Sequence, residues 1–93
     1  MPQSLVDNAA NHRFELAMPE GTAFVAYRRV GDVLHLVHAE VPASLGGRGL
    51  GTRLVRETLE LIRSRGERIV PVCPFVVSFV ARNAEYASLV QGR

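Results

Sequence analysis

Half of the glycines in this 93-residue chain, four of eight, fall within the six residues 46–51. Residues 52–65 follow, with apolar side chains at helical spacing on one side and arginines and glutamates on the other. A strand-like run, Val33–Glu40, comes just before. The predicted order is therefore strand, glycine-rich loop, helix, which leaves the backbone N–H groups of the first helical turn open to a ligand.

These N–H groups carry a partial positive charge and suit a phosphate or pyrophosphate. The residues alone do not fix the ligand, because glycine-rich loops also serve plain turns. No Gly-Lys-Ser/Thr closes the run, so it is not a Walker loop, and position 52 lacks the last glycine of a dinucleotide fingerprint. The glycine-rich run could therefore bind an anion or be an ordinary loop.

Composition narrows the class of protein. With 47% hydrophobic and 22% charged residues, we expect one globular domain over residues 1–93. No apolar run approaches the roughly 20 residues of a membrane span, no secretory pattern begins the chain, and a single cysteine fits the cytoplasm. The 11 basic residues, all arginine, are interleaved with 9 acidic ones, which argues against a nucleic-acid binder.

We expect a mixed α/β (α+β) fold, with residues 1–12 as a loose tail because they show no periodicity. Alternating apolar residues and short turns favour an antiparallel three-stranded meander, followed by a right-handed β-α-β crossover and short C-terminal helices. Gly66 suits the end of the long helix, and Pro71 places the last strand on an edge. The expected strands are residues 13–18, 23–30, 33–40 and 68–73, and the expected helices are 52–65, 75–82 and 84–90.

A parallel pair places the carboxyl ends of its two strands at one edge of the sheet, where α/β proteins tend to bind ligands. His38 and Glu40 end the third strand and Cys73 ends the fourth. We therefore expect these three residues and the glycine loop to converge. His38 and Glu40 have the same parity, so they should point to one face.

Four motifs carry a resemblance to a known family. Residues 41–51 resemble the coenzyme A pyrophosphate loop of GNAT-superfamily N-acetyltransferases. Together with His38-Ala-Glu-Val41, Val70-Pro-Val-Cys-Pro-Phe75 and Asn83-Ala-Glu-Tyr86, the loop resembles the short YjdJ-type branch of GNAT-like proteins over roughly residues 13–90. The resemblance implies a GNAT-like fold and acetyl-CoA or coenzyme A as cofactor. The residues expected to bind the coenzyme are Val41, Gly46, Gly47, Arg48, Gly49, Leu50, Gly51, Thr52, Cys73 and Asn83.

The chain also departs from the family pattern. Gly46 stands where the pattern has Gln or Arg, and Ala39 where the short branch commonly has Thr. Compared with full-length GNAT enzymes, the sequence lacks the N-terminal helices and C-terminal strands that usually build the acceptor pocket. Coenzyme binding is therefore better supported than catalysis.

The candidate catalytic residues are His38, Glu40, Cys73 and Tyr86. His38 or Glu40 could be the base that deprotonates an amine. Cys73 could carry the acetyl group, activated by His38 or by a helix beginning at Pro74, or could simply be buried. Tyr86 could protonate the leaving thiolate or serve in packing.

The leading hypothesis is a small acetyl-CoA-dependent N-acetyltransferase that acts on an unidentified amine. The alternative is a non-catalytic coenzyme A-binding or protein-interaction module, and a weaker one is a phosphate- or nucleotide-binding domain. No His, Cys or carboxylate grouping has zinc-like spacing, so no metal is expected. The acceptor, the key catalytic group and the choice between monomer and homodimer remain open.

Overall fold

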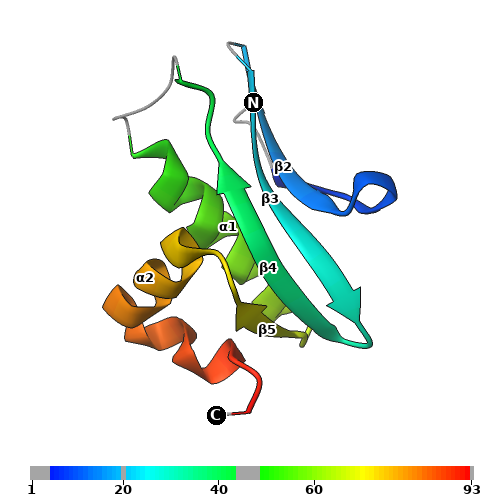
Figure 1. Cartoon of the computed structure of the whole chain (residues 1–93), viewed down its shortest axis with the longest axis vertical. Coiled ribbons are helices and arrows are strands. Elements are labelled where there is room, and N and C mark those ends of the chain that lie inside the picture. The colour runs from blue at the N-terminus through cyan, green and yellow to red at the C-terminus, as the bar shows by residue number, and fades with distance from the viewer. Residues whose placement is uncertain (1–4, 20, 44–48, 93) are drawn as a thin grey trace.

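The computed structural model describes residues 5–19, 21–43 and 49–92. It is a mixed α/β fold in which five strands form one sheet in the order β1-β2-β3-β4-β5 (Figure 1). The first four strands are antiparallel and β4 pairs with β5 in parallel, as the predicted meander and crossover require. The strands are β1 (Leu5–Asn8), β2 (Arg13–Met18), β3 (Gly21–Val30), β4 (Val33–Glu40) and β5 (Arg68–Pro71). The helices are η1 (Ala9–Asn11), α1 (Leu50–Ser64), α2 (Pro74–Arg82) and η3 (Ala84–Leu89).

Helix α1 crosses one face of the sheet and provides much of the core (Figure 1). Its apolar residues recur every three or four positions, so one face is buried while the arginines and glutamates stay outside. Gly66 follows the helix with φ +71, the left-handed conformation that ends helices. The fully buried core side chains include Phe14, Leu16, Val25, Leu34, Leu36, Leu54, Val55, Leu59, Ile62, Ile69, Phe79 and Tyr86.

The expectation of a loose tail over residues 1–12 is wrong for the part that the structure describes. Leu5–Asn8 forms edge strand β1 and pairs with β2, and Ala9–Asn11 forms the helical turn η1. Asp7 explains the order, because its carboxylate accepts hydrogen bonds from Tyr27 Oη (2.7 Å) and Arg65 Nη1 (2.8 Å). Contacts from distant parts of the chain therefore hold a segment that has little strand propensity of its own.

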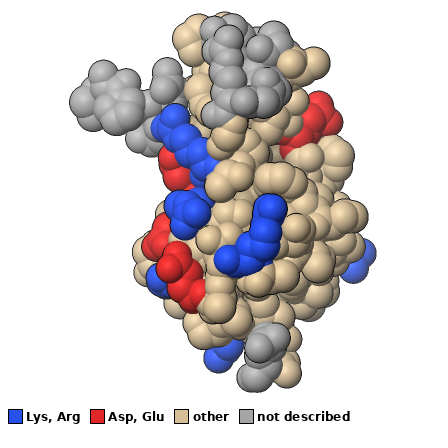
Figure 2. Space-filling view, turned by 90° about the vertical axis from the view of Figure 1, so that its left-hand side faces the viewer, with Lys and Arg blue, Asp and Glu red and all other residues tan. Residues whose placement is uncertain are grey.

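Helix α2 and η3 pack along α1 and run in the same direction, so that residues further along α2 and η3 contact residues further along α1. Gly51 lies beside Phe75, Arg56 lies over the Phe79 ring (5.3 Å), and Glu60 accepts a hydrogen bond from Tyr86 Oη (2.6 Å). The two helices thus begin at the same end of the molecule. Figure 2 shows this helical side, where basic and acidic side chains lie next to one another beside a wide uncharged area.

Candidate functional site

The strands β4 and β5 separate at one point, and this fork defines the candidate site. Their parallel pairing ends at Leu36 and Pro71, where the Leu36 carbonyl accepts hydrogen bonds from the N–H groups of Val72 (3.0 Å) and Cys73 (2.9 Å). Beyond it, the chain after β5 turns into α2, while β4 continues to Glu40 paired with β3. The fork is the space between the last residues of β4 and the start of α2.

A β-bulge in β4 accompanies the fork. Leu36 pairs with Tyr27 but His38 pairs with the next β3 residue, Ala26, so Val37 is the extra residue. The bulge shifts by one residue the alternation of side chains between the two faces of the sheet. Leu34 and Leu36 face the core, yet after the bulge Ala39 and Val41 pack against it instead.

Both helices that follow the parallel strands begin at the fork. Gly49 precedes α1 with φ +72, and among the described residues no side chain caps this helix. Cys73 precedes α2, also without a side-chain cap, and Pro74 occupies the first turn as predicted. Neither first turn contains an acidic residue, so no carboxylate of either turn offsets the partial positive charge of these helix starts.

An apolar pocket of about 120 Å³ lies on the α1 side of the fork. Gly51 forms its floor next to α2, because a Cβ at this position would lie 3.0 Å from Phe75 Cζ. Its lining residues are Ala39, Val41, Gly51, Leu54 and Phe75. Val41 and Gly51 are among the residues expected to bind the coenzyme, whereas Ala39, Leu54 and Phe75 were not proposed as site residues, because an apolar side chain in a strand or helix does not by itself indicate a binding site.

His38 and Glu40 lie together on the face of the sheet opposite α1, as their shared parity predicted. His38 Nε2 is 3.1 Å from Glu40 Oε1, and both side chains are more than half exposed. The His38 ring also lies 5.9 Å from the ring of Phe24, whose neighbours in β3 are buried on the core side. The pair is thus positioned at the fork but on the side away from the pocket.

Cys73 does not end the fourth strand as expected, because β5 stops at Pro71; it lies two residues further on, at the base of the fork, and is 6% exposed. Its thiol belongs to the core cluster, and its backbone carbonyl accepts a hydrogen bond from Val77 N–H (3.0 Å) in the first turn of α2. Within the described residues no hydrogen bond joins Cys73 to His38, which pairs with Glu40 instead. The predicted activation by a helix start fits this geometry better than activation by His38.

Two predicted site residues lie away from the fork. The Tyr86 ring is fully buried against Phe79, and its hydroxyl donates to Glu60, nine residues or about 13 Å along α1 from Gly51. Burial, and then this hydrogen bond to Glu60, raise the pKa of Tyr86. Asn83 ends α2, and its amide donates to the Phe79 carbonyl (2.8 Å). Both side chains are thus engaged in hydrogen bonds within the helical layer.

The predicted coenzyme loop is described only at its end. Gly46, Gly47 and Arg48 lie outside the described residues. Leu50 is the half-buried first residue of α1, and Thr52 is exposed in its first turn.

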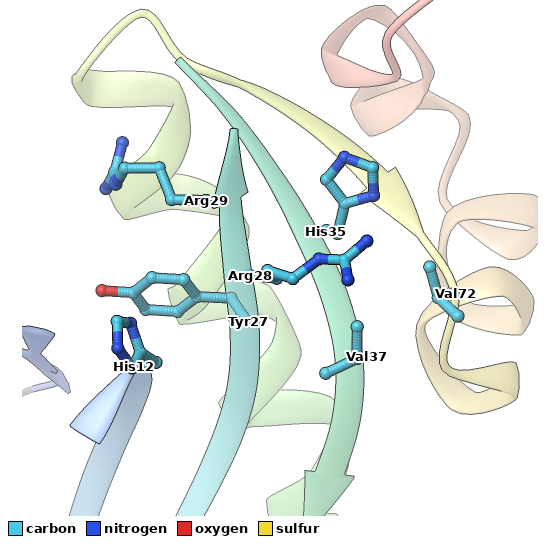
Figure 3. Close-up of a pocket in the computed structure, with 7 residues that line it drawn as sticks. All are labelled: His12, Tyr27, Arg28, Arg29, His35, Val37 and Val72. Atoms are coloured by element: carbon cyan, nitrogen blue, oxygen red, sulfur yellow. The ribbon is translucent and has the colours of Figure 1, made fainter. Parts of the chain in front are cut away.

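A second, larger pocket of about 580 Å³ lies on the open face of the sheet, beside the bulge (Figure 3). Its walls include Val37 and Val72, which flank the fork, and none of the lining residues carries a carboxylate. In Figure 3 the guanidinium of Arg28 extends over β4 between His35 and Val37. The lining residues are His12, Tyr27, Arg28, Arg29, His35, Val37 and Val72. The sequence pattern could not reveal this pocket, because the pocket depends on the bulge in β4 and on η1, and neither was predicted.

Metal sites and membrane-spanning helices are both absent from the described part of the chain. Over residues 5–19, 21–43 and 49–92, no three His, Cys, Asp or Glu side chains gather where they could hold a metal ion. In the same part of the chain, no helix has both the length and the apolar character needed to cross a membrane.

Comparison with known proteins places this geometry in a family. Residues 13–89 match the family model of GCN5-related N-acetyl-transferase, which is most of the chain. An NMR solution structure of a GCN5-like protein from Staphylococcus aureus has a similar fold, with a TM-score of 0.71 and 22% sequence identity over 98% of this chain and 90% of that one. Family and fold support an acetyltransferase-type function. The chain belongs to the GCN5-related N-acetyltransferase family.

Proposed function

We propose that this protein binds acetyl-CoA at the fork between β4 and β5 and transfers the acetyl group to an amine. The observation that supports this most is that two helix starts, neither capped by a described side chain, and an apolar pocket meet at the fork. The start of α1 suits the pyrophosphate, since its N–H groups and partial charge favour an anion. The pocket beside Gly51 and Phe75 suits the apolar part of a pantetheine arm. The residues present therefore fit the coenzyme.

The bound coenzyme would supply an acetyl thioester near Val37 and Cys73. Transfer forms a bond between the amine nitrogen and the acetyl carbon and breaks the bond between that carbon and sulfur. The amine must lose one proton, and the thiolate gains one from solvent. We assign the first proton to His38, because an Nε2–H donated to Glu40 leaves Nδ1 unprotonated and able to accept it.

Cys73 offers a second route for the same reaction. Its sulfur could displace the coenzyme's thiolate, form a thioester with the acetyl group and then pass that group to the amine. Its place before the first turn of α2 brings it to the base of the fork, whereas its burial restricts access. Incubation with acetyl-CoA followed by peptide mass spectrometry separates the routes. Because the chain has no lysine, an adduct at Cys73 is easily assigned, and its absence over a range of pH favours direct transfer.

The test of binding is a thermal-shift titration with acetyl-CoA, coenzyme A and ATP side by side. A ligand at about 100 times its Kd adds roughly 2.7 kcal/mol to the free energy of unfolding, which raises Tm by several degrees in a domain of this size. Stabilisation by both coenzyme forms but not by ATP is expected. Absence of a shift at millimolar coenzyme would refute the proposal.

The test of catalysis is release of free coenzyme A that depends on an added amine. His38→Gln is expected to lower this rate about 100-fold or more and to leave the Kd for acetyl-CoA unchanged. Arg82→Gln, an exposed change at the far end of α2, is the matched control. Coenzyme binding without amine-dependent release would favour the alternative, a non-catalytic coenzyme-binding module.

A further inference from the structure

We propose that the pocket on the open face of the sheet recognises an anionic group, a carboxylate or a phosphate, on the amine acceptor. This inference rests on the proposed function in naming the ligand an acceptor. The fork supplies the coenzyme side of the reaction, and the acceptor must approach the same point from another direction. The open-face pocket reaches that point, because Val37 and Val72 belong both to its walls and to the fork.

Charge indicates what the pocket would bind. Arg28 and His35 are directly paired across β3 and β4, and both line the pocket, which no carboxylate lines. Arg29 is already neutralised by Glu67, with 2.6 Å between Nη1 and Oε2. In the described part of the chain, Arg28 has no such partner and is exposed. Its guanidinium is therefore available to form paired hydrogen bonds with a carboxylate or a phosphate.

The position of Arg28 sets the spacing between the two ends of the acceptor. Its cross-strand partner His35 is two residues, or about 7 Å, from Val37 along β4. In Figure 3 the guanidinium covers part of that distance by extending over β4 toward Val37. His38, the proposed base, follows Val37 on its other side. A small amine whose anionic group lies a few bonds from the nitrogen could thus reach Arg28 and the acetyl group together.

The first experiment measures binding without coenzyme, so that it does not depend on the proposed function. Amide shifts of the ¹⁵N-labelled protein are followed by NMR during titration with two matched pairs: β-alanine against n-propylamine, and O-phosphoethanolamine against ethanolamine. Saturable shifts at Arg28, His35 and Val37 are expected with an anionic member and not with its neutral-skeleton partner. The pair that responds identifies carboxylate or phosphate. Shifts with neither anionic amine, or equal shifts within each pair, would overturn the proposal.

Variants test whether the anionic amine binds because of the pocket or because of the overall positive charge of the protein. Arg28→Gln is expected to weaken binding of the anionic amine roughly tenfold or more. Arg28→Lys should retain part of the affinity, and Arg82→Gln, which removes the same charge outside the pocket, should change it less than about twofold. Equal weakening in Arg28→Gln and Arg82→Gln would assign the effect to net charge and overturn the pocket.

Turnover then tests the role as acceptor. With the anionic amine that binds, Arg28→Gln should raise KM and leave both kcat and the Kd for acetyl-CoA nearly unchanged. Acetyl transfer that shows no preference for the anionic member of a pair would overturn the acceptor assignment while leaving the proposed function intact. Failure of acetyl-CoA to bind would instead refute the proposed function, and the NMR titration would still decide whether the pocket binds anions.

Discussion

The two ends of the sheet differ in how their polar side chains are used. At the end where α1 finishes, which we call the closed end, Asp7, Tyr27, Arg65, Arg29 and Glu67 are joined by hydrogen bonds and ion pairs of 2.6–2.8 Å. At the fork, by contrast, no described side chain caps either helix start, and His38 and Glu40 are exposed. Most polar side chains of the closed end are buried or half-buried in contacts with one another, although Glu67 Oε1 has no hydrogen-bond partner among the described residues. At the fork, the His38–Glu40 pair is exposed to solvent and accessible to a ligand.

This difference predicts that the closed end contributes mainly to stability and the fork mainly to function. Changes at the closed end and in the core beside it should lower the free energy of unfolding, whereas changes at the fork should mainly alter ligand binding. The same burial that makes a residue important for folding keeps it from a substrate. The predictions below are ordered by their expected effect on stability.

Tyr86→Ala should have the largest effect, a loss of about 3–5 kcal/mol in the free energy of unfolding, because it empties a fully buried aromatic site. Tyr86→Phe keeps the ring packing and removes only the hydrogen bond to Glu60, so it should cost about 1 kcal/mol. Urea denaturation measures both. If Tyr86→Phe instead abolished acetyl transfer with coenzyme affinity unchanged, Tyr86 would be a catalytic acid and this separation of stability from function would fail.

Asp7→Asn should lower the free energy of unfolding by about 1–3 kcal/mol, since it weakens hydrogen bonds to a charged group. Burial alone would raise the pKa of Asp7, but hydrogen bonds from Tyr27 and Arg65 outweigh it and lower the pKa. The stabilisation is therefore fully present above the unfolded-state pKa of about 4 and is lost as pH falls through the lower folded-state pKa.

Acid unfolding of the wild type and Asp7→Asn checks this prediction. The variant should lose less stability than the wild type as pH falls below about 4. Glu57→Gln is the control, because the Arg53–Glu57 pair is a half-buried i,i+4 pair on α1, and pairs of this kind contribute about 0.5 kcal/mol or less to the free energy of unfolding. If the free energy of unfolding fell with pH to the same extent in the wild type and in Asp7→Asn, the proposed role of Asp7 in stabilising the closed end would be contradicted.

The sequence predicted the strands of the meander, the crossover and both α-helices, because each follows from local periodicity and turn residues. It did not predict β1, where Asp7 and Asn8 have low strand propensity and the order comes from Tyr27 and Arg65, 20 and 58 residues away from Asp7. The bulge at Val37 was also unpredicted, since no glycine or proline marks it. For that reason the shared face of His38 and Glu40 was predictable, but the identity of that face was not.

Gly51→Ala should change the free energy of unfolding by less than about 1 kcal/mol, because the helix propensity of alanine offsets crowding against Phe75. The added methyl group would lie 3.0 Å from Phe75 Cζ and push this ring into the apolar pocket. We therefore expect acetyl-CoA affinity to fall roughly 3–10-fold, a typical cost of small steric changes at a binding site. Isothermal titration measures the affinity, with Arg82→Gln as the control because Arg82 is exposed at the far end of α2. Unchanged affinity in Gly51→Ala would place the pantetheine arm elsewhere.

His38→Gln should have the smallest effect on stability, within about 0.5 kcal/mol, because the pair with Glu40 is exposed and screened by water. Its effect on amine-dependent coenzyme release should nevertheless be the largest of these variants, since a well-placed base contributes about 100-fold or more. The informative experiment measures the free energy of unfolding and the rate of amine-dependent coenzyme release on the same preparation. A variant that is fully stable and inactive would establish the fork as functional and the closed end as structural. A variant that is fully stable and fully active would remove His38 as the base, and Glu40→Gln would then show whether the carboxylate acts alone.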